Sequence, residues 1–230
     1  MSKNLFITGT GTDVGKTYVT ALIVKKLAEK AKAGYYKAAM SGNQRGKDGS
    51  LIPGDAKWVK DVSGISQSLS SMCPFVYEND WSPHLASRVE GNPVNFDAVE
   101  RGFLALQNDF DFLTVEGSGG ILCPLDFDKN GSRKPIFLED LISGLNLTSI
   151  LVADAGLGTI NSVVLTARYM EERKLPLKGI IFNHYHKGNI MEEDNIFMCQ
   201  HLTGLKVLAC VKEGEENLEL DFETLSGLYE

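Results

Sequence analysis

The chain has 230 residues, which suits one domain over residues 1–230, and its 43% hydrophobic and 23% charged residues exclude a disordered or fibrous protein. The formal net charge of −7 argues against a nucleic-acid-binding protein that relies on a broad basic surface. No apolar run approaches the roughly 18 residues of a membrane span, and no secretory signal precedes the first glycine-rich turn, so we expect a cytoplasmic protein without a membrane partner.

The first predicted elements enclose that glycine-rich turn. A short apolar strand over Lys3–Thr8 leads into GTGTDVGKT, residues 9–17, and then into an apolar-periodic helix over Lys16–Lys30. In a phosphate-binding loop, backbone N–H groups point at phosphate oxygens, while the lysine and hydroxyl of the G-K-S/T end reach the terminal phosphates and Mg²⁺. Five residues rather than the usual four separate Gly9 from Gly15, so the loop is either a longer variant or a chance match.

The rest of the chain alternates predicted strands and helices. The strands are near-continuous apolar runs, typical of parallel strands covered on both faces: Tyr35–Met40, Phe112–Glu116, Ile150–Ala153, Gly179–Phe182 and a candidate last strand at Lys206–Val211. Helical segments lie between several of them: Phe96–Gln107, where Asp97 and Glu100 have capping-box spacing, then Phe137–Ser143, Ile160–Glu172 and Glu192–Leu202. This order predicts a single-domain α/β fold of the phosphate-loop NTPase kind, with a doubly wound, mostly parallel sheet and ligands beyond the carboxyl ends of its strands.

Three charged residues stand where such a fold would bind ligands. Lys37 lies inside an apolar run, where an ammonium is costly unless it meets an anion such as a phosphate; the alternative is a lysine that reaches solvent at the sheet edge. Glu116 ends a buried strand, either as a Mg²⁺ carboxylate or as a helix cap. Asp55 follows the polar loop Ser41–Gly54, and spacing leaves it equally a second metal carboxylate or the N-cap of a short helix.

The histidines and cysteines give less indication of a functional site. His184 and His186 would share one face of a strand end, but no third ligand lies nearby in the sequence, so metal binding is the weaker interpretation. The cysteines have no C-x-x-C or zinc spacing and are predicted to be reduced core thiols: Cys73, Cys123, Cys199 and Cys210.

Four motifs, in this order along the chain, resemble the ATP-dependent dethiobiotin synthetase family: GTGTDVGKT, SPH at residues 82–84, VEGSGG at 115–120 and LGTIN at 157–161. The longer loop is that family's own form. The resemblance runs to about Asn183 and implies a ligase of biotin biosynthesis, which carboxylates 7,8-diaminononanoate with CO₂ and closes the ring through a carbamate and a carbamic-phosphoric anhydride. It also implies ATP as co-substrate, Mg²⁺ as cofactor and a homodimer, while the net charge already argues against a nucleic-acid partner.

The resemblance further implies a role for individual residues. At the reacting groups it places Thr12, Lys16, Lys37 and Ser41. Around the nucleotide it places Asp13, where the family often has Glu, with Val14, Gly15, Lys16, Thr17, Glu116 and Asn183. The metal set is Thr17, Asp55 and Glu116. The substrate is expected to meet Lys37, Ser41, Gly119, Gly120 and, across a dimer interface, Thr159, Ile160 and Asn161. A helix starting at this last turn offers free N–H groups to a carboxylate, and a plain N-cap by Thr159 is the alternative.

Two rival classes remain. Partitioning or positioning ATPases share the fold and act as switches, but they carry a lysine five residues before the Gly-Lys-Thr lysine, where this chain has Gly11. Residues 216–230 are also acidic, which does not suit DNA or a membrane surface. A related ATP-dependent ligase acting on another amine or acid is harder to exclude from the sequence.

Overall fold

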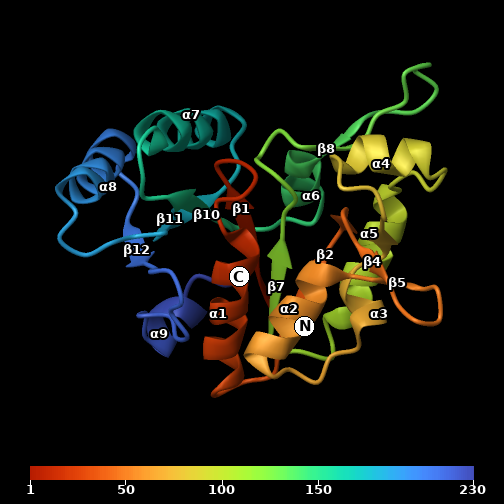
Figure 1. Ribbon diagram of the computed structural model, residues 1–230, viewed down its shortest axis with the longest axis horizontal. Coiled ribbons are helices and arrows are strands. Elements are labelled where there is room, and N and C mark those ends of the chain that lie inside the picture. Colours follow the sequence, from red (N-terminus) through yellow and green to blue (C-terminus); the bar gives the residue numbers. More distant parts are fainter.

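A six-stranded sheet forms the centre of the computed structural model, which describes all 230 residues (Figure 1). Its strands lie in the order β12 (Val207–Cys210), β11 (Leu177–Asn183), β10 (Ser149–Asp154), β1 (Lys3–Gly9), β7 (Phe112–Glu116) and β2 (Ala33–Lys37). Every neighbouring pair is parallel. Later strands lie on both sides of β1, and in such sheets ligands bind beyond the carboxyl ends where the strand order diverges.

Nine helices connect and cover the strands: α1 (Lys16–Ala28), α2 (Gly54–Ser63), α3 (Leu69–Met72), α4 (Pro83–Val89), α5 (Phe96–Leu106), α6 (Leu138–Gly144), α7 (Thr159–Glu172), α8 (Ile190–Thr203) and α9 (Phe222–Ser226). Leu5 and Ile7 of β1 pack with α1, α2 and α9 on one face, whereas Phe6 packs with α5 and α6 on the other. On that second face α7 and α8 cover β10 and β11. Because both faces are covered, a strand must be apolar at nearly every position, which explains the continuous apolar runs. The predicted α/β fold with a parallel sheet is confirmed.

Three short ladders lie outside the main sheet: β3 (Ala39–Met40) with β6 (Phe75–Val76), β4 (Gln44–Arg45) with β5 (Leu51–Ile52), and β8 (Pro124–Asp126) with β9 (Ile136–Phe137). The β4–β5 ladder occupies the segment Ser41–Gly54, which was expected to be a polar loop without strands. None of the helices combines the length and the apolar character needed to cross a lipid bilayer.

One predicted strand is wrong at both ends. The run Tyr35–Met40 was expected to form a single strand, but β2 starts two residues earlier and leaves the sheet after Lys37. Its neighbour β7 ends at Glu116, which pairs with Lys37 in the ladder, so the following residues have no partner there. They pair with β6 instead, as the separate strand β3.

The five helices for which the sequence predicted bounds, α1, α5, α6, α7 and α8, begin and end within two residues of them, but one start signal is wrong. Asp97 and Glu100 do not form the expected capping box. The N-cap of α5 is Asn95, whose side chain accepts a hydrogen bond from the Ala98 N–H at 2.9 Å. Asparagine is as good an N-cap as aspartate, because its side-chain oxygen satisfies a free N–H of the first turn.

A side-chain amide covers part of the outer edge of β2, which has no further strand beside it. Oε1 of Gln67 accepts a hydrogen bond from the Tyr35 N–H at 2.8 Å, and Nε2 of Gln67 donates to the Tyr35 carbonyl at 2.9 Å. Gln67 therefore replaces one residue of a missing neighbouring strand, and it fixes the backbone of Tyr35 from the side opposite to β7.

The C-terminus is tied to the start of the sheet. The Asn4 N–H donates to the Glu230 carbonyl at 2.6 Å, and the Glu230 N–H donates back at 3.1 Å. The neighbouring Tyr229 is buried, with its hydroxyl 2.6 Å from Oγ1 of Thr114 on β7. The segment after β12 thus completes the packing around α1 and β7.

All four cysteines are free thiols, as predicted. Cys73 and Cys199 are buried in the core, whereas Cys123 and Cys210 are only partly buried, so the expectation of a core position holds for two of them.

Candidate active site

The glycine-rich loop joins β1 to α1 at the carboxyl edge of the sheet. Gly15 is the N-cap of α1 and has a left-handed backbone with a φ of 83°, which glycine adopts without strain. A Cβ at this position would lie 2.0 Å from Nδ2 of Asn183, so the close approach also requires glycine. That amide donates to the Val14 carbonyl at 3.2 Å and ties the loop to the end of β11. The first turn of α1 leaves N–H groups without helical partners, which suits an anion.

Lys16 is buried at the start of α1 and folds back on its own loop. Its Nζ donates to the Gly11 carbonyl at 2.7 Å. Burial first, and the nearby Lys37 ammonium second, lower the pKa of Lys16 to about 8, while Glu116 and Asp55 oppose the shift. An ammonium that is desolvated and has only a neutral carbonyl as partner gains free energy when an anion binds beside it.

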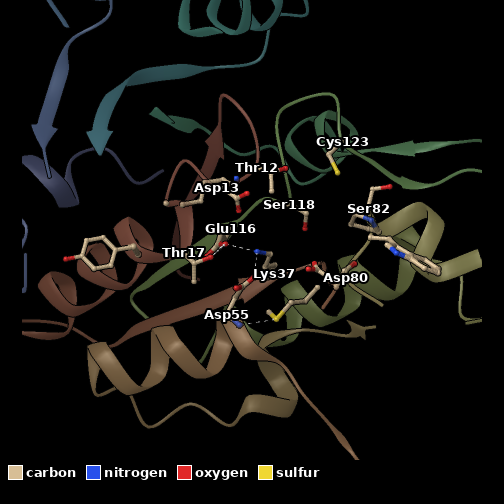
Figure 2. Close-up of a pocket in the computed structure, with 18 residues that line it drawn as sticks. Thr12, Asp13, Thr17, Lys37, Asp55, Asp80, Ser82, Glu116, Ser118 and Cys123 are labelled. Carbon is tan, nitrogen blue, oxygen red and sulfur yellow. Dashed lines mark hydrogen bonds and ion pairs between the residues drawn. The ribbon is translucent and has the colours of Figure 1, made fainter. Parts of the chain in front are cut away.

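Glu116 is the centre of a polar cluster at the ends of β7 and β2. Its Oε1 accepts hydrogen bonds from the Thr17 hydroxyl at 2.7 Å and from Lys37 Nζ at 2.7 Å. The same Nζ donates to Oδ2 of Asp55 at 2.6 Å. Figure 2 shows these four side chains pointing toward one another from α1, α2, β2 and β7. The in-register pairing of β2 with β7 sets Lys37 directly beside Glu116.

The cluster explains how a lysine is accommodated in an apolar strand. Burial alone would lower the pKa of Lys37, but the carboxylates of Glu116 and Asp55 outweigh it and raise the pKa above its ordinary value. Lys37 is 5% exposed, so the alternative of a lysine reaching solvent is wrong. It meets anions as expected, and those anions are two side-chain carboxylates.

Neither Asp55 nor Glu116 caps a helix. The N-cap of α2 is Pro53, without a side-chain capping bond, and Asp55 directs its carboxylate to Lys37 instead. Glu116 is the last residue of β7. The capping alternatives for both residues are therefore wrong, and their role toward a metal ion stays a prediction.

A cavity of about 480 Å³ opens beside the cluster. The loop lines it with Thr12, Asp13, Gly15, Lys16 and Thr17. The other predicted residues in its wall are Lys37, Ser41, Asp55, Glu116 and Gly119. The Ser41 hydroxyl is buried without a hydrogen-bond partner, which a ligand in the cavity would supply.

Other predicted residues lie away from the cavity wall, among them Val14, Gly120 and Asn183. The turn at residues 157–161 is also outside it. Gly158 is the N-cap of α7, with a φ of 92°, so the alternative of an N-cap by Thr159 is wrong.

The cavity also contains residues that the sequence did not predict to belong to the site. Asp80, Trp81, Ser118 and Cys123 line it; the first two precede the SPH motif and Ser118 lies within VEGSGG, so proximity to a motif was the available signal. Behind the cluster, the Tyr35 hydroxyl donates to Oε2 of Glu116 at 3.0 Å.

Tyr35 is fully buried, and its burial, with the Glu116 carboxylate next in effect, raises the pKa of its hydroxyl well above the ordinary value. The phenol therefore remains a hydrogen-bond donor. Its spacing of two residues from Lys37 places both on one face of β2, which was the only sequence signal for it.

The two histidines after β11 face separate carboxylates. Nδ1 of His184 lies 2.6 Å from Oδ2 of Asp154, and Nδ1 of His186 lies 3.0 Å from Oε1 of Glu192. Each imidazole thus has its own partner, and the pair does not converge on one point.

A parallel sheet whose first strand leads through a glycine-rich loop into a helix, with lysine, hydroxyl and carboxylate groups at the loop, defines a phosphate-loop NTPase. The family model described as an AAA domain matches residues 3–218. ATP-dependent dethiobiotin synthetase BioD of Brachyspira hyodysenteriae is 42% identical, over 97% of this chain and 100% of that protein. The protein of the same name from Clostridium botulinum (strain Loch Maree / Type A3) is 41% identical, over 100% of this chain and 99% of that one. The chain belongs to the ATP-dependent dethiobiotin synthetase family, a family of ligases.

Solved structures share the fold with less sequence similarity. The MinC:MinD cell division complex of Aquifex aeolicus has a TM-score of 0.57 at 14% identity, covering 98% of this chain and 85% of that one. MinD of Pyrococcus horikoshii with Mg-ADP has a TM-score of 0.52 at 14% identity, covering 93% and 82%. These structures show the fold alone. Sequence identity of 42% and 41% to the two dethiobiotin synthetases, against 14% to the MinD structures, separates this chain from those ATPases.

Proposed function

We propose that this chain is a cytoplasmic enzyme that carboxylates 7,8-diaminononanoate with CO₂ and closes the ring to dethiobiotin, at the expense of ATP. The observation that carries the proposal is a single cavity in which the phosphate loop, two lysines and a carboxylate cluster meet, in a chain that aligns over its whole length with a protein named dethiobiotin synthetase. A related ligase acting on another amine would share the phosphate loop, so the substrate is what the experiment below must test.

The reaction needs three bond-forming steps. One amine of the substrate adds to CO₂, loses a proton and becomes a carbamate. A carbamate oxygen attacks the γ-phosphorus of ATP, and ADP leaves. The second amine then attacks the carbonyl carbon of the mixed anhydride, phosphate leaves, and the ureido ring closes with loss of a proton. The substrate supplies every nucleophile, so the protein has to position the reactants and neutralise charge.

The residues in the cavity wall suit that task. Lys16 has only the neutral Gly11 carbonyl as partner and would gain by turning to the terminal phosphate. The free hydroxyl of Ser41 is available to the substrate. Burial raises the pKa of the Cys123 thiol to about 11, although Lys16 and Lys37 oppose the shift, so this thiol is protonated near neutral pH and unsuited to nucleophilic attack.

A magnesium ion fits the oxygen atoms of the cluster. The Thr17 hydroxyl and the carboxylates of Asp55 and Glu116 are the hard ligands that Mg²⁺ prefers, and Thr17 Oγ1 already lies 2.7 Å from Glu116 Oε1. When bound, the ion would neutralise charge on the phosphates. Lys37, which links both carboxylates, would hold them in place and carry positive charge beside the transferred phosphoryl group.

We infer that a second copy of the chain completes the substrate site. Thr159 belongs to the expected substrate set, yet it lies outside the cavity and its buried hydroxyl has no partner. Large apolar side chains are exposed just before α7, on α7 and at the start of the adjacent α8: Leu157 at 91%, Leu165 at 63% and Ile190 at 84%. Exposed apolar residues on neighbouring elements support a contact surface.

The proposed function is tested by supplying purified protein with diaminononanoate, ¹⁴C-bicarbonate, ATP and Mg²⁺. We expect acid-stable label to form in step with phosphate release, and both to cease when diaminononanoate is omitted. A Lys16→Met variant should yield neither product. Phosphate release without acid-stable label, or faster labelling of another diamine or amino acid, would contradict the proposal.

A further inference from the structure

We propose that Tyr35 is a positioning residue, whose hydroxyl holds the Glu116 carboxylate in the orientation that serves Thr17, Lys37 and a bound divalent cation. The inference rests on the proposed function of the site to the extent that it takes Glu116 as a metal carboxylate. The hydrogen bond from the Tyr35 hydroxyl to Oε2 of Glu116, 3.0 Å long, carries it.

The two oxygens of Glu116 have separate tasks. Oε1 accepts from Thr17 and Lys37, two residues of the cavity wall, at 2.7 Å each. Oε2 accepts from Tyr35, whose phenol belongs to the apolar core between β2, α1 and α2. One oxygen of the carboxylate thus accepts a hydrogen bond from Tyr35 in the core, and the other accepts hydrogen bonds from two residues of the cavity wall.

The carboxylate needs such a donor because its own torsion does not fix it. The last side-chain torsion of glutamate has a broad energy profile, so rotamer preference leaves the plane of the carboxylate free to turn. A carboxylate that rotates no longer points its oxygen at the metal ion. Groups that hydrogen-bond to a metal ligand commonly fix its orientation. The side chain of Glu116 is fully buried, so water does not replace the Tyr35 hydroxyl.

The backbone of Tyr35 is itself held on both sides. In the sheet it pairs with Thr114 of β7, and on its outer side it exchanges two hydrogen bonds with the side chain of Gln67. A phenol anchored in this way presents its hydroxyl at a fixed point, which a residue on a loop would not do.

The neighbouring Tyr36 provides a matched control. It is also buried, but it lies on the opposite face of β2 and its hydroxyl donates to the Val99 carbonyl at 2.7 Å. Tyr35→Phe and Tyr36→Phe therefore each delete one buried hydroxyl and one hydrogen bond from adjacent positions. Only the first should affect the cluster.

The experiment measures Mn²⁺ binding to the protein in the presence of ADP, from the loss of the free Mn²⁺ signal in electron paramagnetic resonance, corrected for the complex that Mn²⁺ forms with ADP alone. We expect Tyr35→Phe to weaken Mn²⁺ binding roughly 10-fold, as loss of a partner behind a metal ligand does. Tyr36→Phe should leave the affinity within about twofold of the wild type. Circular dichroism checks that both variants are folded.

A second comparison uses Glu116→Gln. If Tyr35 acts through the carboxylate, Tyr35→Phe should add no further loss of Mn²⁺ affinity in the Glu116→Gln background. Equal losses from the two tyrosine variants, an unchanged affinity in Tyr35→Phe, or an undiminished effect in the Glu116→Gln background would each overturn the inference. So would a wild-type protein that takes up no Mn²⁺ beyond the ADP complex. None of these measurements uses diaminononanoate, so they are independent of the dethiobiotin assay.

Discussion

Replacing Lys16 with methionine should stabilise the protein while it removes activity. Burial, with the Lys37 ammonium second, lowers the pKa of Lys16 from 10.5 to about 8, a difference that corresponds to roughly 3 kcal/mol at about 1.4 kcal/mol per pKa unit. Methionine keeps most of the length of the side chain without the charge. It loses the hydrogen bond to the Gly11 carbonyl, worth about 1 kcal/mol, so the expected gain in the free energy of unfolding at pH 7 is about 2 kcal/mol.

The gain in the free energy of unfolding of Lys16→Met over the wild type should decrease as the pH rises. Below pH 8 the lysine is charged in the folded and the unfolded chain, and the full cost of burying the charge is present. Between about pH 8 and 10.5 the folded protein gives up this proton before the unfolded chain does, so the wild type gains stability relative to the variant. At pH 10 the two proteins should therefore differ by less than about 0.5 kcal/mol.

Urea unfolding of both proteins at pH 7 and pH 10, without nucleotide, measures this difference while the contributions of other titrating groups cancel. Lys26→Met is the control, because this lysine lies on the same helix with its side chain 25% exposed and should change stability by no more than about 0.5 kcal/mol. A Lys16→Met variant that is no more stable than the wild type at pH 7, or that keeps the same advantage at pH 10, would refute the reasoning.

The metal site, the subunit interface and the C-terminus each give a further prediction. Glu116→Gln should raise the Mg²⁺ concentration for half-maximal rate about 10-fold or more, because an amide is a poorer ligand than a carboxylate; an unchanged titration would remove Glu116 from the metal site. Lys16→Met mixed with a Thr159/Asn161 double substitution should recover activity in up to about half of the sites of mixed dimers, since one site takes both lesions. An inactive mixture with proven subunit exchange would put the whole site in one chain. Tyr229→Phe should lower the free energy of unfolding by about 1 kcal/mol at unchanged kcat, and equal urea midpoints would exclude a contribution from this hydroxyl.

Site residues could be predicted from the sequence where a charged residue stands in an otherwise apolar segment. Lys37 in an apolar run and Glu116 at the end of another are costly unless they serve a purpose, and both lie in the cluster. Their direct contact could not be predicted from spacing, because it joins residues 79 positions apart and depends on β2 lying next to β7.

Tyr35 shows why other features of the site and the fold could not be predicted from the sequence. A tyrosine in an apolar strand is ordinary core composition, and only the three-dimensional arrangement reveals where its hydroxyl goes. The break between β2 and β3 has a similar cause, because the chain leaves the sheet where β7 ends rather than where its own sequence changes. The role of Asp55 was ambiguous for a third reason, because an aspartate can either cap a helix or bind a cation. In the structure its carboxylate binds the Lys37 ammonium.

The amide of Gln67 also bears on how the chain behaves in a crowded solution. An open sheet edge can pair with the same edge of another molecule, and such pairing starts aggregation. At the middle of β2, Gln67 already occupies the N–H and the carbonyl that an incoming strand would need. The contact joins residues 32 positions apart and forms only when the segment after α2 folds over the edge. Until then the edge of β2 is exposed and can pair with the same edge of another chain. The yield on refolding should therefore fall as the protein concentration rises.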